Sequence, residues 1–226
     1  MLLSSIAPHL DLANHHADAT AADIKRLCAD VVKYSFNAGF VNPCYIALAK
    51  EELKGKAKVG TALSFPLGQD TLEMKVFAAR EAIRLGADEL DVGANNGLLL
   101  FDETAYLEEM KAIVSALRQI QQKTIIKFIL ETGYLHESNI RAGAKAILAS
   151  GADFVKICSG MGPRGASLDD VRLVKEAIGT APINIKVAGS IDTLEEARAF
   201  LSAGAQRIGT SKAVEIMEQV WYTTPI

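Results

Sequence analysis

The sequence predicts an α/β protein that folds as a single (β/α)8 TIM barrel over residues 1–226. Three observations favour this fold: short apolar runs alternate with longer amphipathic stretches, eight of the short runs resemble buried strands, and no Pro-, Gly- or Ser-rich linker divides the chain. Eight parallel strands separated by helices close naturally into a barrel. A doubly wound open sheet is the structural alternative.

A weak internal repeat supports the alternation of helices and strands. The segments Gly86-Ala-Asp-Glu-Leu-Asp91, Gly151-Ala-Asp-Phe-Val-Lys156 and Gly204-Ala-Gln-Arg-Ile-Gly209 each follow a helical pattern and begin with glycine. Glycine suits the left-handed conformation at the end of a helix. Each segment is therefore predicted to be a junction at which a helix ends and a strand begins.

The short apolar runs predict the strands, which are rich in residues that fit a buried sheet. We expect them near Leu10–Leu12, Gly39–Val41, Lys58–Ala62, Glu89–Val92, Thr124–Leu130, Phe154–Ile157, Asn184–Val187 and Arg207–Ile208.

Helices are predicted where apolar residues recur at a spacing of about 3.6. Examples are Ala21–Tyr34, Thr71–Leu85, Tyr106–Gln121, Glu137–Ser150, Leu168–Ile178 and Leu194–Ala203. Thr20 and Thr193 are expected to cap two of them, and Glu196 completes a capping box with Thr193.

Composition indicates an ordinary soluble protein. Hydrophobic residues make up 50% of the chain, charged residues 23%, and the net charge is −3, so neither nucleic acid nor membrane is an expected partner. The three cysteines, Cys28, Cys44 and Cys158, have no metal-ligand spacing. We therefore expect reduced thiols and a cytoplasmic location.

Two lysines interrupt apolar runs that should be core strands: Lys156 and Lys186. Burying an ammonium group is costly unless it has a partner, a lowered pKa or a chemical role. Asp91 occupies a similar place in another strand. Because active sites of such barrels lie at the carboxyl ends of the strands, these three residues are the predicted catalytic group.

The proximity of a second lysine and apolar surroundings would favour the neutral, nucleophilic form of Lys156, which suits Schiff-base chemistry. Structural ion pairs with Asp91 or Glu131 are the alternative interpretation of the lysines. Residues 187–190 and 208–212 would follow the last two strands, where barrels often bind phosphate. Ordinary turn chemistry also explains their glycines and hydroxyl residues.

The chain resembles the deoxyribose-phosphate aldolase family, which joins acetaldehyde to glyceraldehyde 3-phosphate through a Schiff base. The resemblance covers nearly the whole chain. Its motifs are Asp11-Leu12, Asp18-Ala-Thr20, Val41-Asn-Pro43, Phe65-Pro-Leu-Gly68, Gly86-Ala-Asp-Glu-Leu-Asp91, Lys127 with Glu131-Thr132, Gly151-Ala-Asp-Phe-Val-Lys156, Lys186-Val-Ala-Gly189 and Arg207-Ile-Gly-Thr-Ser211.

The resemblance implies a role for each site residue. Lys156 would form the Schiff base, Lys186 would lower its pKa, and Asp91 would act as the acid/base with a water. Lys127 would support this network. Further substrate and phosphate contacts are implied for Ser159, Gly160, Gly189, Ser190 and Ser211.

The resemblance also implies that small aldehydes and a sugar phosphate are the substrates, that the protein is a homodimer, and that neither cofactor nor metal is needed. The adjacent His15 and His16 lack the spacing of a metal site. A family role in proton transfer for a C-terminal tyrosine is not carried over to Tyr222, because no motif surrounds it.

Departures from the family pattern surround the substrate pocket. The run after Lys156 reads Ile-Cys-Ser-Gly160, a second glycine is replaced by Ser190, a second serine by Lys212, and Ala13-Asn14 stands where threonine is usual. Lys212 and Arg164 would restore positive charge if they pointed inward. An aldolase with a different or unphosphorylated acceptor, and a sugar-phosphate isomerase or binding barrel, are the alternative functions.

Overall fold

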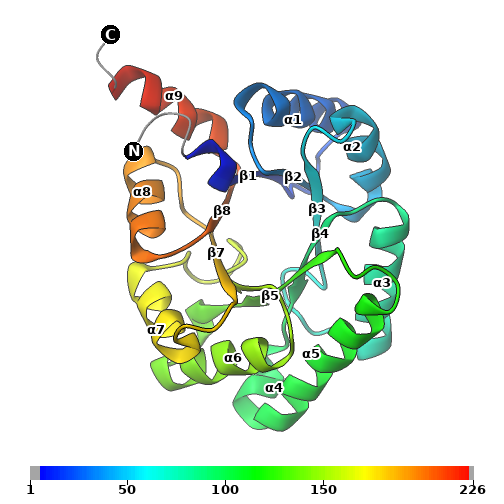
Figure 1. Ribbon diagram of the computed structural model, residues 1–226, viewed down its shortest axis with the longest axis vertical. Helices are drawn as coiled ribbons and strands as arrows, with labels where there is room; N and C mark the ends of the chain where they lie inside the picture. Colours follow the sequence, from blue (N-terminus) through cyan, green and yellow to red (C-terminus); the bar gives the residue numbers. More distant parts are fainter. Residues whose placement is uncertain (1–5, 224–226) are drawn as a thin grey trace.

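The protein forms a closed barrel of parallel strands surrounded by helices, as Figure 1 shows. The structure, a computed structural model, describes the backbone of residues 6–223 and the side chains of residues 6–220. Within this part, strands pair in chain order from β1 to β8, and β8 pairs with β1. This closure confirms the predicted TIM barrel and excludes the open sheet.

The strands lie close to their predicted positions. Their bounds are β1 Leu10–Asn14, β2 Ala38–Val41, β3 Lys58–Leu63, β4 Glu89–Gly93, β5 Ile125–Leu130, β6 Phe154–Ile157, β7 Asn184–Ala188 and β8 Arg207–Thr210.

The helices form the outer ring. They are α1 Ala21–Tyr34, α2 Ile46–Leu53, α3 Leu72–Arg84, α4 Asn96–Phe101, α5 Glu103–Arg118, α6 Glu137–Ala149, α7 Leu168–Ile178, α8 Leu194–Ala203 and α9 Ala213–Thr223. Single 3-10 turns cover Ala7–His9, Pro43–Tyr45 and Thr132–Tyr134. Helix α9 packs beside α8 and α1 (Figure 1).

Local signals in the sequence explain most helix ends. Thr20 and Thr193 cap their helices as predicted, and each accepts a hydrogen bond within a capping box. The box at Thr193 with Glu196 was predicted, whereas the box at Thr20 with Asp23 was not. Gly86, Gly151 and Gly204 all have positive φ, which confirms the three helix-to-strand junctions. The predicted helix 106–121 was displaced, because Asp102 caps Thr104 and Ala105 and starts α5 at Glu103.

The core has two regions of different chemistry. Between strands and helices the packing is aliphatic, with fully buried residues such as Leu90 and Ile113. Inside the barrel, Phe40 fills the space that Gly60 leaves open, since a Cβ on Gly60 would lie 2.3 Å from the Phe40 ring. Buried charged side chains, among them Asp91, Lys127 and Lys186, also lie inside the barrel and form the candidate site.

Candidate active site

The predicted catalytic residues meet inside the barrel. Lys156 on β6 and Lys186 on β7 are partners in the strand register, and both point to the interior. Each Nζ lies 2.9 Å from the same Oδ2 of Asp91 on β4. The structure therefore brings together three residues that are up to 95 positions apart in sequence, Asp91 and Lys186 being the most distant.

Lys127 on β5 lies beneath this group. Its Nζ contacts Asp91 Oδ1 at 2.9 Å and Glu89 Oε2 at 2.6 Å, and its side chain is fully buried. Its ammonium also lies 4.9 Å from the centre of the Phe40 ring, within cation–π range. Lys127 does not line the substrate cavity, so its place is in the charge network and not at the substrate.

Two carboxylates that sequence reasoning did not select complete the network. Asp11 Oδ2 lies 2.8 Å from Lys186 Nζ, and Glu89 bridges Lys127 and the partly exposed Lys58. Asp11, Glu89 and Asp91 balance Lys127, Lys156 and Lys186 when all six are ionised. Each buried charge thus has a partner, which offsets its cost of desolvation. The sequence does carry one signal for Glu89: it lies two residues before Asp91 on the same strand, so the two side chains point to the same side.

The electrostatics favour a neutral Lys156. Burial lowers the pKa of Lys156, and the charges of Lys186 and Lys127 lower it further against the opposing effect of Asp91. Burial alone would raise the pKa of Asp91, but the three lysines hold it well below its ordinary value. Asp91 is therefore a carboxylate at neutral pH, and the lowered pKa of Lys156 increases the share of its neutral amine.

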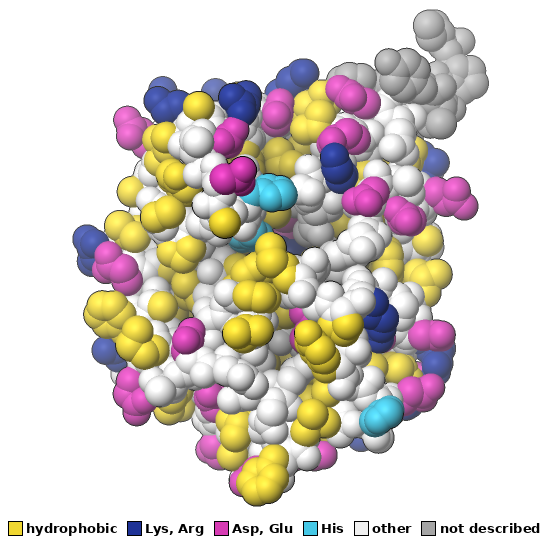
Figure 2. Space-filling view, turned by 180° about the vertical axis from the view of Figure 1, so that it is seen from behind, with side chains coloured by type: hydrophobic (Ala, Val, Ile, Leu, Met, Phe, Trp, Pro, Cys, Tyr) yellow, Lys and Arg dark blue, Asp and Glu magenta, His cyan; other side chains and the backbone are white. Residues whose placement is uncertain are grey.

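A cavity of about 230 Å³ opens above the lysines. Its lining includes Lys156, Lys186, Ser159, Gly160, Gly189, Ser190 and Ser211 together with four residues that the sequence did not single out as substrate contacts, namely His15, Met161, Asp192 and Thr210. The space-filling view shows a hollow near the middle of this face, with histidine and hydrophobic side chains at its rim (Figure 2).

The loops after β6 and β7 approach each other at one end of the cavity. Gly160 and Gly189 have φ values of 87° and 88°, and a Cβ on Gly189 would lie 2.8 Å from Gly160 Cα. Glycine is required at Gly189 by both the backbone conformation and this close approach. Ser190, which replaces a glycine of the family pattern, adopts a φ of 55°, so its side chain is accommodated in the left-handed region.

The two cations expected to compensate for the altered loops do not line the cavity. Lys212 pairs with Glu215 at 3.0 Å, and Arg164 binds Asp170 and the carbonyl oxygens of Thr132 and Gly165. Their side chains are drawn to nearby carboxylates, which the sequence pattern did not reveal. Meanwhile Asp192 adds a carboxylate to the cavity wall.

The loop after β6 is held from below by Glu131, Thr132 and Asp170. Glu131 Oε2 accepts a hydrogen bond from the Ser159 amide, and Thr132 donates to Asp170. Cys158 lies beside Thr132 and is fully buried, and burial raises its pKa to about 12. The thiol is therefore protonated and structural, as the sequence suggested.

No group of three or more His, Cys, Asp or Glu side chains within the described residues is arranged to hold a metal ion. None of the described helices is long and apolar enough to cross a membrane. Tyr222 has its side chain outside the described part of the structure.

The chain is similar to one known family of aldolases over most of its length. Residues 6–213 match the DeoC/LacD family aldolase. A deoxyribose-phosphate aldolase of Caldicellulosiruptor saccharolyticus is 41% identical over 221 residues, covering 97% of this chain and all of the relative. One of Thermococcus gammatolerans is 40% identical, covering 96% and 97% of the two chains.

Solved structures give the same result. The aldolase QR15 superimposes with a TM-score of 0.90 and 32% identity, and covers 96% of both chains. A deoxyribose phosphate aldolase from Aeropyrum pernix, described as a tetramer, has a TM-score of 0.90 and 26% identity over 99% of this chain and 94% of that one.

Proposed function

Because the chain belongs to the DeoC/LacD aldolase family, we propose that its barrel is a class I aldolase that reversibly cleaves 2-deoxy-D-ribose 5-phosphate to acetaldehyde and D-glyceraldehyde 3-phosphate. It is a carbon–carbon lyase. The observation that carries the residue assignment is the pair of in-register lysines that share one oxygen of Asp91. We also propose that residues 1–226 act as one catalytic domain.

The cleavage begins with Lys156 in its neutral form. Its Nζ attacks the C1 aldehyde, and loss of water from the carbinolamine gives a protonated imine. A water bound to Asp91 relays the protons of these steps, and the carboxylate stays ionised because of the surrounding lysines. Lys186 stays close to Lys156 through Asp91 and favours its free amine.

The carbon–carbon bond then breaks. The C3 hydroxyl loses its proton to the water relay, the C2–C3 electron pair moves toward the iminium nitrogen to form an enamine, and glyceraldehyde 3-phosphate leaves. A proton returns to C2, and water hydrolyses the imine to release acetaldehyde and regenerate Lys156. In this scheme the protonated imine is the electron sink, and we expect chelators to have no effect.

The phosphate is assigned to the end of the cavity formed by Gly160, Gly189, Ser190 and Ser211, whose backbone amides and hydroxyls are suitable donors. Ser159 also lines the cavity. Deoxyribose 5-phosphate bound as a Schiff base at C1 and through its phosphate at C5 would lie extended along the cavity. The cavity lining contains both groups that this ligand needs, namely the Lys156 amine and the donors of the loop residues.

Borohydride trapping tests the proposal. Protein treated with acetaldehyde and borohydride should gain one reduced adduct, which peptide mapping should place on Lys156, and Lys156→Arg should abolish both the adduct and deoxyribose 5-phosphate cleavage. Lys75→Arg, at a buried lysine that contacts Glu109 on the outer layer, is the matched control. Cleavage without an adduct would refute the Schiff-base mechanism and favour another lyase chemistry, whereas turnover of a sugar phosphate with neither cleavage nor adduct would favour an isomerase.

An unphosphorylated aldehyde acceptor is the second candidate, because Asp192 lines the cavity while Lys212 and Arg164 are paired elsewhere. A carboxylate at that end disfavours an anionic ligand. Comparing kcat/KM for 2-deoxyribose 5-phosphate and 2-deoxyribose distinguishes the two acceptors. A higher value for the unphosphorylated sugar would replace our assignment of the phosphate loop.

We further propose a homodimer in the cytoplasm. The described surface exposes large apolar side chains, among them Leu67, Phe77 and Phe101, the last being 91% exposed. All three cysteines are free thiols, as expected in a reducing compartment. Light scattering after size-exclusion chromatography measures the assembly, and a monomer would contradict it.

A further inference from the structure

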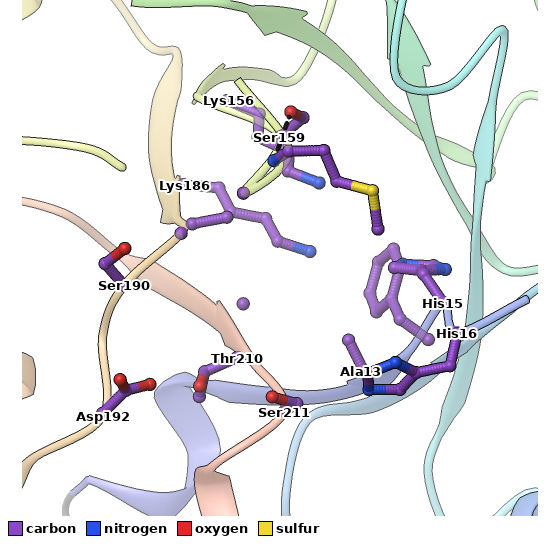
Figure 3. Close-up of a pocket in the computed structure, with 16 residues that line it drawn as sticks. Ala13, His15, His16, Lys156, Ser159, Lys186, Ser190, Asp192, Thr210 and Ser211 are labelled. Carbon is purple, nitrogen blue, oxygen red and sulfur yellow. Dashed lines mark hydrogen bonds between the residues drawn. The ribbon is translucent and has the colours of Figure 1, made fainter. Parts of the chain in front are cut away.

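His15 lines the cavity and has no role in the aldolase mechanism described above. It follows the last residue of β1 and lines the cavity with Lys156 and Lys186. Figure 3 shows it across the cavity from the ends of both lysines. Its ring packs against Phe65, with the ring centres 5.2 Å apart, and Phe65 in turn lies near the Lys156 ammonium. The imidazole is thus held at the reacting end of the cavity.

The hydrogen bonds around His15 determine which ring nitrogen carries the proton. Asn42 donates from Nδ2 to the backbone oxygen of His16 at 3.3 Å, which orients its amide. Asn42 Oδ1 then lies 3.4 Å from His15 Nδ1. An amide oxygen only accepts hydrogen bonds, so Nδ1 must be the protonated nitrogen. Nε2 is left with a free lone pair.

The imidazole is neutral at the pH of the cell. Burial, the largest cause, lowers the pKa of His15 to about 4, and Lys156 acts in the same direction whenever it is protonated, although the hydrogen bond to Asn42 opposes both. Among the described residues, none donates a hydrogen bond to Nε2. The cavity lining therefore contains the neutral His15 imidazole, whose Nε2 can accept a hydrogen bond, together with two lysines. A lysine ammonium group can only donate hydrogen bonds.

A ligand that satisfies Nε2 needs a hydrogen-bond donor on that side. The carbonyl oxygen of an aldehyde cannot provide it, whereas a hydroxyl group can. We propose that His15 is a specificity-determining residue that accepts a hydrogen bond from the hydroxyl group next to the carbonyl of the acceptor aldehyde. The site consequently prefers α-hydroxyaldehydes to aldehydes that lack this hydroxyl. The inference rests on the proposed aldol reaction.

Two acceptors of equal length and charge isolate this contact: D-glyceraldehyde 3-phosphate and 3-phosphooxypropanal, which lacks the α-hydroxyl. With acetaldehyde as donor, the unaltered protein should prefer the hydroxylated acceptor. His15→Leu should lower kcat/KM for that acceptor about 10-fold, as expected for loss of one hydrogen bond at a partly buried group, and leave the other nearly unchanged. His15→Gln, which keeps an acceptor, should retain part of the preference.

A reaction that needs only the donor separates substrate contact from a structural role. Exchange of the α-protons of acetaldehyde in D2O requires Lys156 and the enamine but no acceptor, so His15→Leu should lower its rate far less than it lowers kcat/KM for the hydroxylated acceptor. His136→Gln, at an exposed histidine at the start of α6, is the control for the general effect of losing an imidazole.

Equal losses with both acceptors, a loss of donor exchange, or an unchanged preference in His15→Leu would each overturn the assignment of His15. Failure of the aldol reaction itself gives a different result, because the unaltered protein would then show neither donor exchange nor a borohydride adduct.

Discussion

Replacing Lys186 with leucine should slow imine formation at Lys156 about 100-fold at neutral pH. Both lysine nitrogens lie 2.9 Å from Asp91 Oδ2, so they are separated by no more than about 6 Å. At about 6 Å and an effective dielectric constant of about 20, two like charges repel by about 3 kcal/mol. That energy corresponds to about a 100-fold change in the neutral fraction of Lys156.

Loss of Lys186 acts in the same direction through Asp91. With one cation removed, the carboxylate stabilises the ammonium form of Lys156 more strongly. The variant should therefore recover activity as the pH rises, with a rate that increases about 10-fold per pH unit, since each pH unit changes the neutral amine fraction by this factor.

The assay is the rate of borohydride-trapped acetaldehyde adduct, measured by mass spectrometry between pH 6 and pH 10. Lys75→Leu is the matched control, because it also removes a buried, paired lysine but lies between α3 and α5 and away from the site. Circular dichroism confirms that each variant is folded. A Lys186→Leu profile with the shape and position of the original would refute the electrostatic role, and an equal loss at every pH would indicate altered packing.

Three further predictions concern stability, the cavity loop and the thiols. Burial would raise the pKa of Glu89, but Lys127 outweighs burial and lowers this pKa to about 2 from an ordinary 4.5. Glu89 therefore contributes about 3 kcal/mol of stability that is present above about pH 4.5 and lost as the pH falls toward 2. Urea unfolding should show that Glu89→Gln loses less stability between pH 5 and pH 3 than the unaltered protein, and an equal loss of stability would contradict this. Gly189→Ala should raise KM for deoxyribose 5-phosphate about 10-fold or more, because a Cβ would lie 2.8 Å from Gly160 Cα. The borohydride-trapped acetaldehyde adduct should still form in this variant. An unaltered KM would exclude the loop as the phosphate site. A thiol reagent at pH 8 should label the exposed Cys44 well before the buried Cys28 and Cys158, because burial raises the pKa values of these two thiols to about 11 and about 12. Cys44→Ser should remove the rapid phase of labelling. Persistence of that rapid phase would show that a buried thiol is accessible.

The meeting of Lys156, Lys186 and Asp91 inside the barrel was predictable because its signals are local. A lysine in an apolar strand is conspicuous in the sequence, and the barrel rule puts the carboxyl ends of all strands at one face. The sequence therefore predicts that these three residues lie together. The same local logic predicted the caps at Thr20 and Thr193 and the glycine junctions.

The boundaries of α5 and the existence of α2, α4 and α9 were harder to predict from the sequence. Residues 96–101 form a helix of only six residues after the Asn95 cap, and such a short segment has too few turns for a clear apolar period. The start of α5 depended on whether Asp102 would cap its backbone, which competes with other turns that aspartate can form.

The sequence by itself determined the alternation of strands and helices and the strands that carry the lysines, because periodicity and glycine positions act over a few residues. Only the tertiary structure decided that Asp91 bridges both lysines, that Asp11 and Glu89 balance the buried charge, that Lys212 and Arg164 pair outside the cavity, and that His15 faces the lysines. These outcomes depend on distances across the barrel and on competing carboxylates from other elements. Barrel closure, which pairs β8 with β1, sets those distances, and no local pattern encodes them.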